Sequence, residues 1–228
     1  MDKLIKCHFY YLMNKLMIVV FLLTIAAVIF FSLFTVLSFD ERTLPYMLSS
    51  DYYLSIYEVI KLVMFILVIF LFGYSFILSN DGYNAIIIGK DISRTKYFIS
   101  KTIVLFLVFS FIYIAIIAFS IVIGLAFDVF FSKTMLKSFI FLYILLMIYG
   151  ELSIILVLVF DNIYIVFITI PLSLISYDKT IYFLAFILPL VVKSSTNSFS
   201  LPWWYYLFEI VVLYITTIIL FNRKDLSN

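Results

Sequence analysis

The sequence predicts an all-α integral membrane protein that forms one transmembrane domain over residues 1–228. Of these residues, 66% are hydrophobic and only 12% are charged, whereas a soluble domain has about 25% charged residues. The apolar residues also lie in long blocks separated by short polar connectors. A transmembrane helix needs about 20 apolar residues to cross the hydrocarbon core of a bilayer, and several blocks reach this length.

Six blocks are predicted to cross the membrane. They cover approximately residues 16–38, 56–79, 102–127, 139–160, 163–180 and 203–221. The first apolar run is too long for the core of a signal peptide, and no small-residue cleavage pattern follows it. We therefore expect it to be retained as the first transmembrane helix. Pro45 lies in the polar connector to the second block, where it would break a helix.

Residues 1–15 have the pattern of an amphipathic helix. Apolar Ile5, Phe9 and Leu12 share one face, and polar Lys3 and Lys6 lie on the other. Such a helix can lie in the headgroup layer before the chain enters the bilayer. The alternative is a basic flanking segment with no fixed structure.

The segment 163–202 has an irregular pattern. Its first apolar run contains Pro171, and a second run of about 12 residues, the length typical of re-entrant or interfacial segments, contains Pro189. The pattern predicts a fifth transmembrane helix followed by a re-entrant or lipid-facing half-helix. One long kinked helix is the alternative, and both interpretations leave six crossings.

The distribution of lysine and arginine predicts the orientation in the membrane. If the N-terminus is cytoplasmic, the cytoplasmic segments hold Lys3, Lys6, Lys15, Lys90, Arg94, Lys96, Lys101, Arg223 and Lys224, and the outer segments hold Arg42, Lys133, Lys137, Lys179 and Lys193. Positive residues favour the cytoplasmic side. Both termini are therefore expected in the cytoplasm. The many Phe, Tyr, Ile, Lys and Asn residues are typical of an AT-rich bacterial genome, so the membrane is expected to be a bacterial plasma membrane.

Several special residues lie inside the apolar blocks. Glu58 and Lys61 are three residues apart on one helix face, which predicts a neutralising pair. Glu151 and Glu209 are isolated carboxyl groups that are costly in a bilayer. They could line a substrate path or contact a neighbouring helix or protein. The glycines within the blocks, Gly73, Gly124 and Gly150, are expected to permit close helix packing.

The residue inventory excludes several functions. One cysteine, Cys7, allows no internal disulfide, and Cys7 with the one histidine, His8, cannot form a zinc site. Gly89-Lys90 lacks the residues of a phosphate-binding loop. No catalytic base or nucleophile pair is visible, so intrinsic catalysis, a directly bound cofactor and a metal site are not expected. The net charge of +2 gives no reason to expect nucleic-acid binding.

The polar segment 80–101, which we call the island, is the main connector. Its sequence is NDGYNAIIIGKDISRTKYFISK. Asp81-Gly82 ends the second block, and residues 83–89 could form a short helix along the membrane surface that Gly89 ends. Ser93 can cap the helix that enters the third block. Arg94 and Lys101 share one face and are expected in the headgroup layer.

This arrangement resembles the intracellular loop of ABC-2-type transporter permeases, the membrane subunits of type-2 ABC exporters. In that family an acidic residue ends the second span, and a coupling helix, a Ser-Arg element, an aromatic-rich turn and a Lys follow. Asp81 stands at the acidic position and Ser93-Arg94 at the Ser-Arg element. Tyr97-Phe98 stands at the aromatic turn and Lys101 at the Lys. Two departures are Asp for the usual Glu and Ile92 for the usual Pro.

The resemblance implies a function and partners. Two six-span subunits, identical or related, would pair with two separate ATPase chains that bind ATP and magnesium. The resemblance assigns ATPase coupling to Asp81, Gly82, Tyr83, Ile86, Ile87, Gly89, Asp91, Ser93, Arg94 and Lys101. Glu151 and Glu209 would be candidates for the path of an amphipathic or hydrophobic substrate such as a peptide. The alternative is a secondary transporter, channel subunit or accessory scaffold that ATP does not drive.

Overall fold

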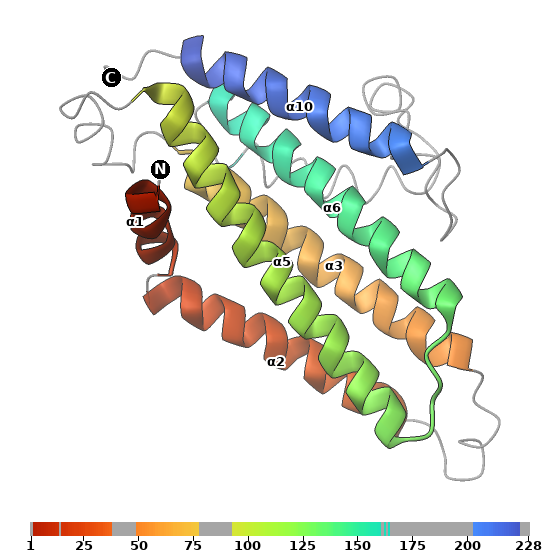
Figure 1. The fold of residues 1–228 in the computed structure, drawn as a ribbon. Coiled ribbons are helices and arrows are strands. Elements are labelled where there is room, and N and C mark those ends of the chain that lie inside the picture. The colour runs from red at the N-terminus through yellow and green to blue at the C-terminus, as the bar shows by residue number, and fades with distance from the viewer. Residues whose placement is uncertain are drawn as a thin grey trace.

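The computed structural model describes residues 2–13, 15–37, 49–77, 93–160, 162, 164 and 203–223. Most of these residues form helices, and none of them lies in a strand. The helices are α1 (Asp2–Leu12), α2 (Lys15–Leu37), α3 (Ser49–Ser75), α5 (Arg94–Ala126), α6 (Lys133–Phe160) and α10 (Trp203–Arg223) (Figure 1). All except α1 are long and apolar enough to cross a membrane, which makes five candidate spans. The expectation of a helical membrane protein is therefore confirmed.

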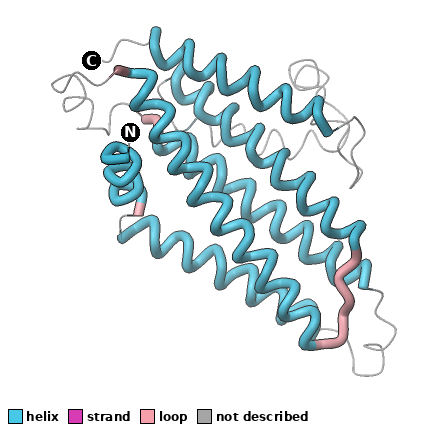
Figure 2. The backbone as a smooth tube through the Cα atoms, viewed as in Figure 1, coloured by secondary structure: helices cyan, strands magenta, loops and turns pink. Residues whose placement is uncertain are grey.

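The long helices lie side by side as one bundle, and α1 stands across one end of it (Figure 1). Helix α6 packs between α3 and α10, and α2 packs against α3 and α5. Helices α5 and α6 are joined by the loop 127–132, which is drawn in pink in Figure 2. The predicted fifth span, 163–180, and the re-entrant segment after it lie outside the described residues.

Two helices begin earlier than the hydropathy pattern predicted. Helix α3 begins at Ser49 rather than near residue 56, and α6 begins at Lys133 rather than near 139. The tyrosines at the start of α3 explain the first difference. The hydroxyl groups of Tyr52 and Tyr53 donate to the Ser120 and Val129 carbonyls at 3.1 and 3.4 Å. Because these hydroxyl groups find hydrogen-bond acceptors on α5 and just after it, the tyrosines can be buried. The residues before 56, which were predicted to be a connector, can therefore belong to helix α3.

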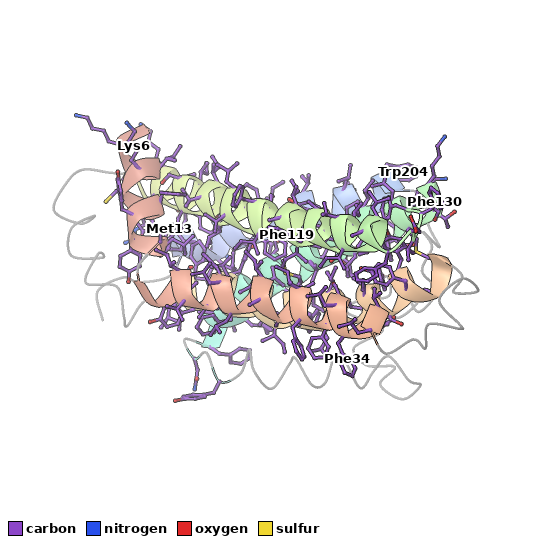
Figure 3. The ribbon with its side chains drawn as sticks, turned by 90° about the horizontal axis from the view of Figure 1, so that it is seen from below. Lys6, Met13, Phe34, Phe119, Phe130 and Trp204 are labelled. Atoms are coloured by element: carbon purple, nitrogen blue, oxygen red, sulfur yellow. The ribbon has the colours of Figure 1, made fainter. Side chains whose placement is uncertain are left out.

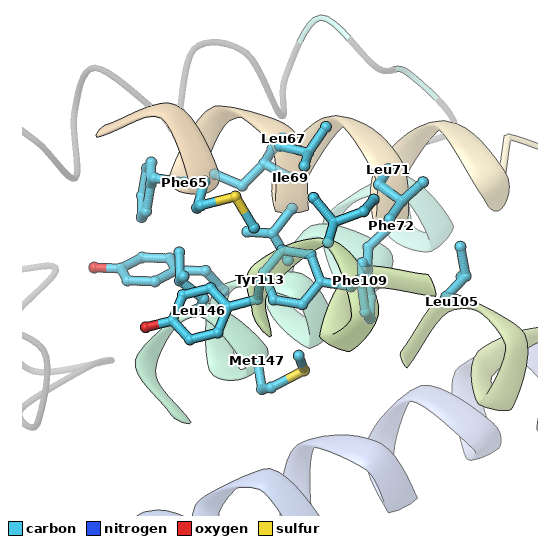
Figure 4. Packing of buried hydrophobic residues seen from close by; sticks show 14 of the residues in the cluster. Phe65, Leu67, Ile69, Leu71, Phe72, Leu105, Phe109, Tyr113, Leu146 and Met147 are labelled. Atoms are coloured by element: carbon cyan, nitrogen blue, oxygen red, sulfur yellow. The ribbon is translucent and has the colours of Figure 1, made fainter. Parts of the chain in front are cut away.

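The core consists of interlocking apolar and aromatic side chains (Figure 4). Phe72 of α3 is fully buried and meets Phe109 of α5 edge-on, with ring centroids 6.2 Å apart. Leu146 of α6 is buried in the same cluster. Outward-facing residues are also apolar; Phe34 and Trp204, labelled in Figure 3, are both more than half exposed. This exposed apolar surface suits contact with lipid.

Two of the three predicted packing glycines are in close contact with aromatic rings. A Cβ atom on Gly150 would lie 3.0 Å from Phe72 Cδ1, and one on Gly124 would lie 2.6 Å from the Tyr53 hydroxyl oxygen. Gly73 is buried in α3. The predicted ion pair between Glu58 and Lys61 also forms, with Lys61 Nζ 3.0 Å from Glu58 Oε2.

Gly124→Ala is expected to lower the free energy of unfolding by about 1–3 kcal/mol, the usual cost of overpacking. The new methyl group would meet the hydroxyl oxygen of Tyr53 at 2.6 Å and Cε1 of Tyr52 at 2.9 Å. Thermal unfolding in detergent measures the loss. In a Tyr53→Phe background, which lacks the nearest atom, Gly124→Ala should cost less. An equal cost in both backgrounds would contradict this explanation.

Candidate functional site

The described part of the island forms the start of α5. Ser93 has extended backbone angles, φ −60° and ψ 136°, and its hydroxyl accepts a hydrogen bond from the Lys96 backbone N–H at 3.4 Å. The predicted N-cap at Ser93 is therefore confirmed. From Arg94 the helix continues unbroken to Ala126. Tyr97 and Phe98 consequently lie in the helix that was predicted to follow Ser93.

The first turn of α5 is bound to the last turn of α10. Arg94 Nη1 donates to the Asn222 carbonyl at 3.3 Å, and Asn222 Nδ2 donates to Thr95 Oγ1 at 3.1 Å. A cation suits this place, because the last carbonyls of a helix carry partial negative charge. The connection joins residues more than 120 positions apart in sequence, and no local pattern indicated it.

Four aromatic side chains, Phe76, Tyr97, Phe98 and Phe221, form a cluster beneath this connection that we call the junction. All four are buried. The Phe98 centroid lies 5.2 Å from that of Phe76 in the chain just after α3, and 5.3 Å from that of Phe221 in α10. Tyr97 stacks on Phe221 with centroids 6.1 Å apart. The junction thus links α3, α5 and α10 at one end of the bundle.

Lys101 lies within this aromatic environment. We expected its side chain in the headgroup layer, but it is only 5% exposed, so that expectation was wrong. Its Nζ donates to the Tyr97 hydroxyl at 3.2 Å and lies 5.0 Å from the centroid of the Phe76 ring. Aromatic faces attract a cation, and the apolar stem of lysine packs well in such surroundings. Arg94, in contrast, is exposed, as expected.

His8 connects α1 to the junction, which the sequence did not indicate. Its ring meets Tyr97 edge-on with centroids 4.7 Å apart, and the side chain is buried. Burial, and then the positive charge of Lys101, lower the pKa of His8 from 6.5 to about 4. The available signal was the spacing of Ile5, His8 and Leu12, which places His8 on the inward face of α1. Phe9, assigned to that face, is instead 45% exposed.

The pKa of His8 predicts acid sensitivity of the contact between α1 and α5. An exposed histidine in the unfolded chain gains a proton below pH 6.5, whereas folded His8 stays neutral until about pH 4. The unfolded state therefore binds more protons in this interval, so the free energy of unfolding should fall as the pH falls from 6.5 to 4. His8→Phe keeps an aromatic ring against Tyr97 and should remove this part of the dependence. Thermal unfolding in detergent across this pH range, compared between the two proteins, tests it; parallel curves would contradict it.

The remaining predicted coupling residues lie outside the described residues. They are Asp81, Gly82, Tyr83, Ile86, Ile87, Gly89 and Asp91. The described chain does show what flanks them. Ile77 is buried directly after α3, and Ser93 begins the next element. The two ends of this segment are thus joined directly to α3 and α5.

The two candidate path residues lie on α6 and α10. Glu151 is fully buried, and its Oε2 accepts a hydrogen bond from Thr217 Oγ1 at 3.2 Å. Its Oε1 and the buried Oε2 of Glu209 have no hydrogen-bond partner within the described chain. Thr217 was not singled out from sequence. Within the same described ranges, no group of His, Cys, Asp and Glu is placed to hold a metal ion.

Comparison with known proteins gives no match. Neither the profiles of protein families, nor the curated proteins, nor the solved structures include one that is similar to this chain at a significant level. The geometry of the junction and of the buried carboxyl groups is therefore the basis for a functional proposal.

Proposed function

We propose that this chain is the permease subunit of an ATP-binding cassette exporter of the ABC-2 type. In this proposal a separate ATPase binds ATP and magnesium and docks on residues 81–89. A second permease subunit, identical or related, completes the transporter. Both termini face the cytoplasm of a bacterial cell, and the substrate is amphipathic or hydrophobic, with peptides as the favoured class.

One observation carries the proposal most strongly: the end of the island is packed against three other helices. Ser93 starts α5, Arg94 holds the end of α10, and the rings of Tyr97 and Phe98 contact α1, α10 and the residue that follows α3. A force applied to residues 81–91 would therefore reach several spans together. Packed cores tend to move between discrete arrangements rather than deform continuously, which is what alternating access requires.

The arrangement of the chain ends supports the orientation. Helix α1, the start of α5 and the end of α10 meet at one end of the bundle (Figure 1). That end carries Lys3, Lys6, Arg94, Lys96, Lys101 and Arg223, whereas the described part of the opposite end carries Lys133 and Lys137. Under the positive-inside rule it is the cytoplasmic end, where an ATPase would have access to the island.

The proposal is tested by crosslinking and reconstitution. A photo-crosslinking amino acid at Ile87 should capture an ATPase chain encoded beside this protein, and the reconstituted pair should hydrolyse ATP faster than the ATPase alone. The same amino acid at exposed Phe130, at the opposite end of the bundle, is the control. Absence of an ATPase from the Ile87 products, or an unchanged hydrolysis rate, would argue against the proposal.

The buried carboxyl groups favour the alternative of an ion-coupled transporter. A carboxyl oxygen without a partner inside a bilayer often marks an ion or proton path, and Glu151 Oε1 has this character within the described chain. Transport that needs an ion gradient, continues without ATP and is lost in Glu151→Gln would support this function instead.

A further inference from the structure

A deep apolar groove opens on the outside of the bundle between α1, α2 and α5. It has a volume of about 680 Å³. Phe21 and Ile25 of α2 and Val108 of α5 line its length. Figure 3 shows α1 standing across the end of α2 and α5, and residues of α1 line the groove at this end.

The groove is polar only where α1 closes it. Lys6 and Tyr10 line that end, and both are exposed. On α2 the lining runs from Ile18 to Ile25, and on α5 from Val104 to Ile112. At 1.5 Å per residue these stretches are about 11–12 Å long, which is most of the roughly 15 Å depth of one leaflet of the hydrocarbon core.

We propose that this groove is a binding site for one anionic phospholipid. An acyl chain lies along the apolar part between α2 and α5, and Lys6 binds the phosphate of the headgroup. The hydroxyl of Tyr10 lies at the same level, where amphipathic rings favour the membrane interface. The groove therefore has a cation at one end and apolar residues along the rest of its length. A phospholipid has the matching arrangement, with an anionic headgroup and an apolar acyl chain.

Charge favours an anionic lipid over a second copy of this chain as the occupant. Copies side by side in one membrane would bring like ends together, and α1 carries Lys3 and Lys6 against one acidic residue, Asp2. The exposed carboxylates of the long helices and their described connection, Glu58 and Asp128, lie in the opposite half of the bundle. An anionic phosphate is complementary to this positive end. This site does not depend on ATP-driven transport.

Two matched pairs of variants test the site. Leu22 lines the groove and is 61% exposed, whereas its neighbour Leu23 is 64% exposed and does not line it. Lys6 and Lys3 are likewise both exposed residues of α1, and only Lys6 lines the groove. Leu22→Trp and Lys6→Gln should disturb the site, while Leu23→Trp and Lys3→Gln are the controls.

The measurement is retention of added phosphatidylglycerol by the detergent-purified full chain, followed by native mass spectrometry. We expect each of the two variants to weaken binding about tenfold. Leu22→Trp places a large ring in the apolar part of the groove, and Lys6→Gln removes the cation that binds the phosphate. The controls should bind like the unchanged protein, and phosphatidylcholine should bind more weakly than phosphatidylglycerol in every protein with an intact site. Thermal unfolding checks that all four variants fold.

Three results would overturn the proposal. Equal weakening by Lys3→Gln or Leu23→Trp would show attraction to the charged end without a defined site. Equal retention of phosphatidylcholine would show that the headgroup charge is not recognised. Conversion of a dimer to a monomer by Leu22→Trp, with lipid binding unchanged, would show that a second copy covers the groove.

Discussion

Arg94→Glu is expected to reduce ATP-coupled transport about tenfold while the protein still folds and inserts. In the folded chain the Arg94 guanidinium donates to the Asn222 carbonyl at 3.3 Å. A carboxylate there would face the negative end of α10 and separate it from α5. Loss of a charged hydrogen bond of about 1.5 kcal/mol corresponds to about a factor of ten. The free energy of unfolding should fall by no more than about 1.5 kcal/mol, because the contact is exposed.

Lys96→Glu is the matched control for this experiment. It makes the same change of charge in the same turn of α5, but the Lys96 side chain makes no hydrogen bond or ion pair within the described chain. Transport and ATP hydrolysis are measured in proteoliposomes that contain the ATPase. Equal loss in both variants would indicate a general effect of charge on docking. Normal transport in Arg94→Glu would contradict a role of the connection between α5 and α10 in coupling.

Gly89→Trp, beyond the described residues, tests the proposed entry point in the same assay. If residues 81–89 receive the ATPase, a large ring at Gly89 should prevent docking and leave membrane insertion intact. Comparison with Arg94→Glu separates two steps, because Gly89→Trp should abolish stimulation of the ATPase, whereas Arg94→Glu should preserve docking and lose transport. Unaltered transport in both variants would contradict this placement of the coupling element.

Glu151→Lys is expected to prevent stable folding, whereas Glu151→Gln should be tolerated. Glu151 is fully buried, and its Oε2 accepts a hydrogen bond from Thr217 at 3.2 Å. In a lysine variant the Thr217 hydroxyl would keep only its bond to the Leu213 carbonyl of its own helix. The lysine would also place a charge in the membrane interior, which costs about 2.5–3.5 kcal/mol on insertion scales. Glutamine is uncharged, has nearly the same shape and can accept the same hydrogen bond. It should stay within about 1 kcal/mol of the unchanged protein.

Size-exclusion chromatography and thermal unfolding in detergent distinguish these outcomes. Ser153→Lys is a useful comparison, because Ser153 is also buried in α6 and bonds only to the carbonyl of Gly150 in its own helix. If Glu151→Gln were as damaging as Glu151→Lys, the negative charge itself would be needed for the fold. That result would require a cationic partner outside the described residues.

Some features could be predicted because they depend on neighbours in sequence. The cap at Ser93 and the pair of Glu58 with Lys61 both join residues three positions apart in one helix. The apolar blocks likewise predicted helices that the structure contains. The errors at the starts of α3 and α6 came from the same source, since hydropathy alone counts tyrosine and lysine residues as connector. At the start of α3 the bundle satisfies the tyrosine hydroxyls, and at the start of α6 the lysines are exposed helix residues.

Other features could not be predicted because membrane helices are apolar on both their packed and their lipid-facing sides. The residues that face lipid on α5, such as Phe111 and Ile114, look in sequence like buried Phe109 and Ile112. The pattern therefore did not show which face meets α10. For the same reason, the sequence did not show that Lys101 and His8 lie beside Tyr97.

The sequence by itself determined that this is a helical membrane protein, because length and hydropathy of a segment decide whether it can cross a bilayer. It also indicated where the island lies. The tertiary structure decided that the island leads into a junction that links the end of α3 with α5 and α10 and that His8 of α1 contacts. It also decided that Lys101 lies beside Tyr97 and Phe76 in the protein interior. These contacts join residues that are distant in sequence, and packing between helix faces of equal hydrophobicity selects them.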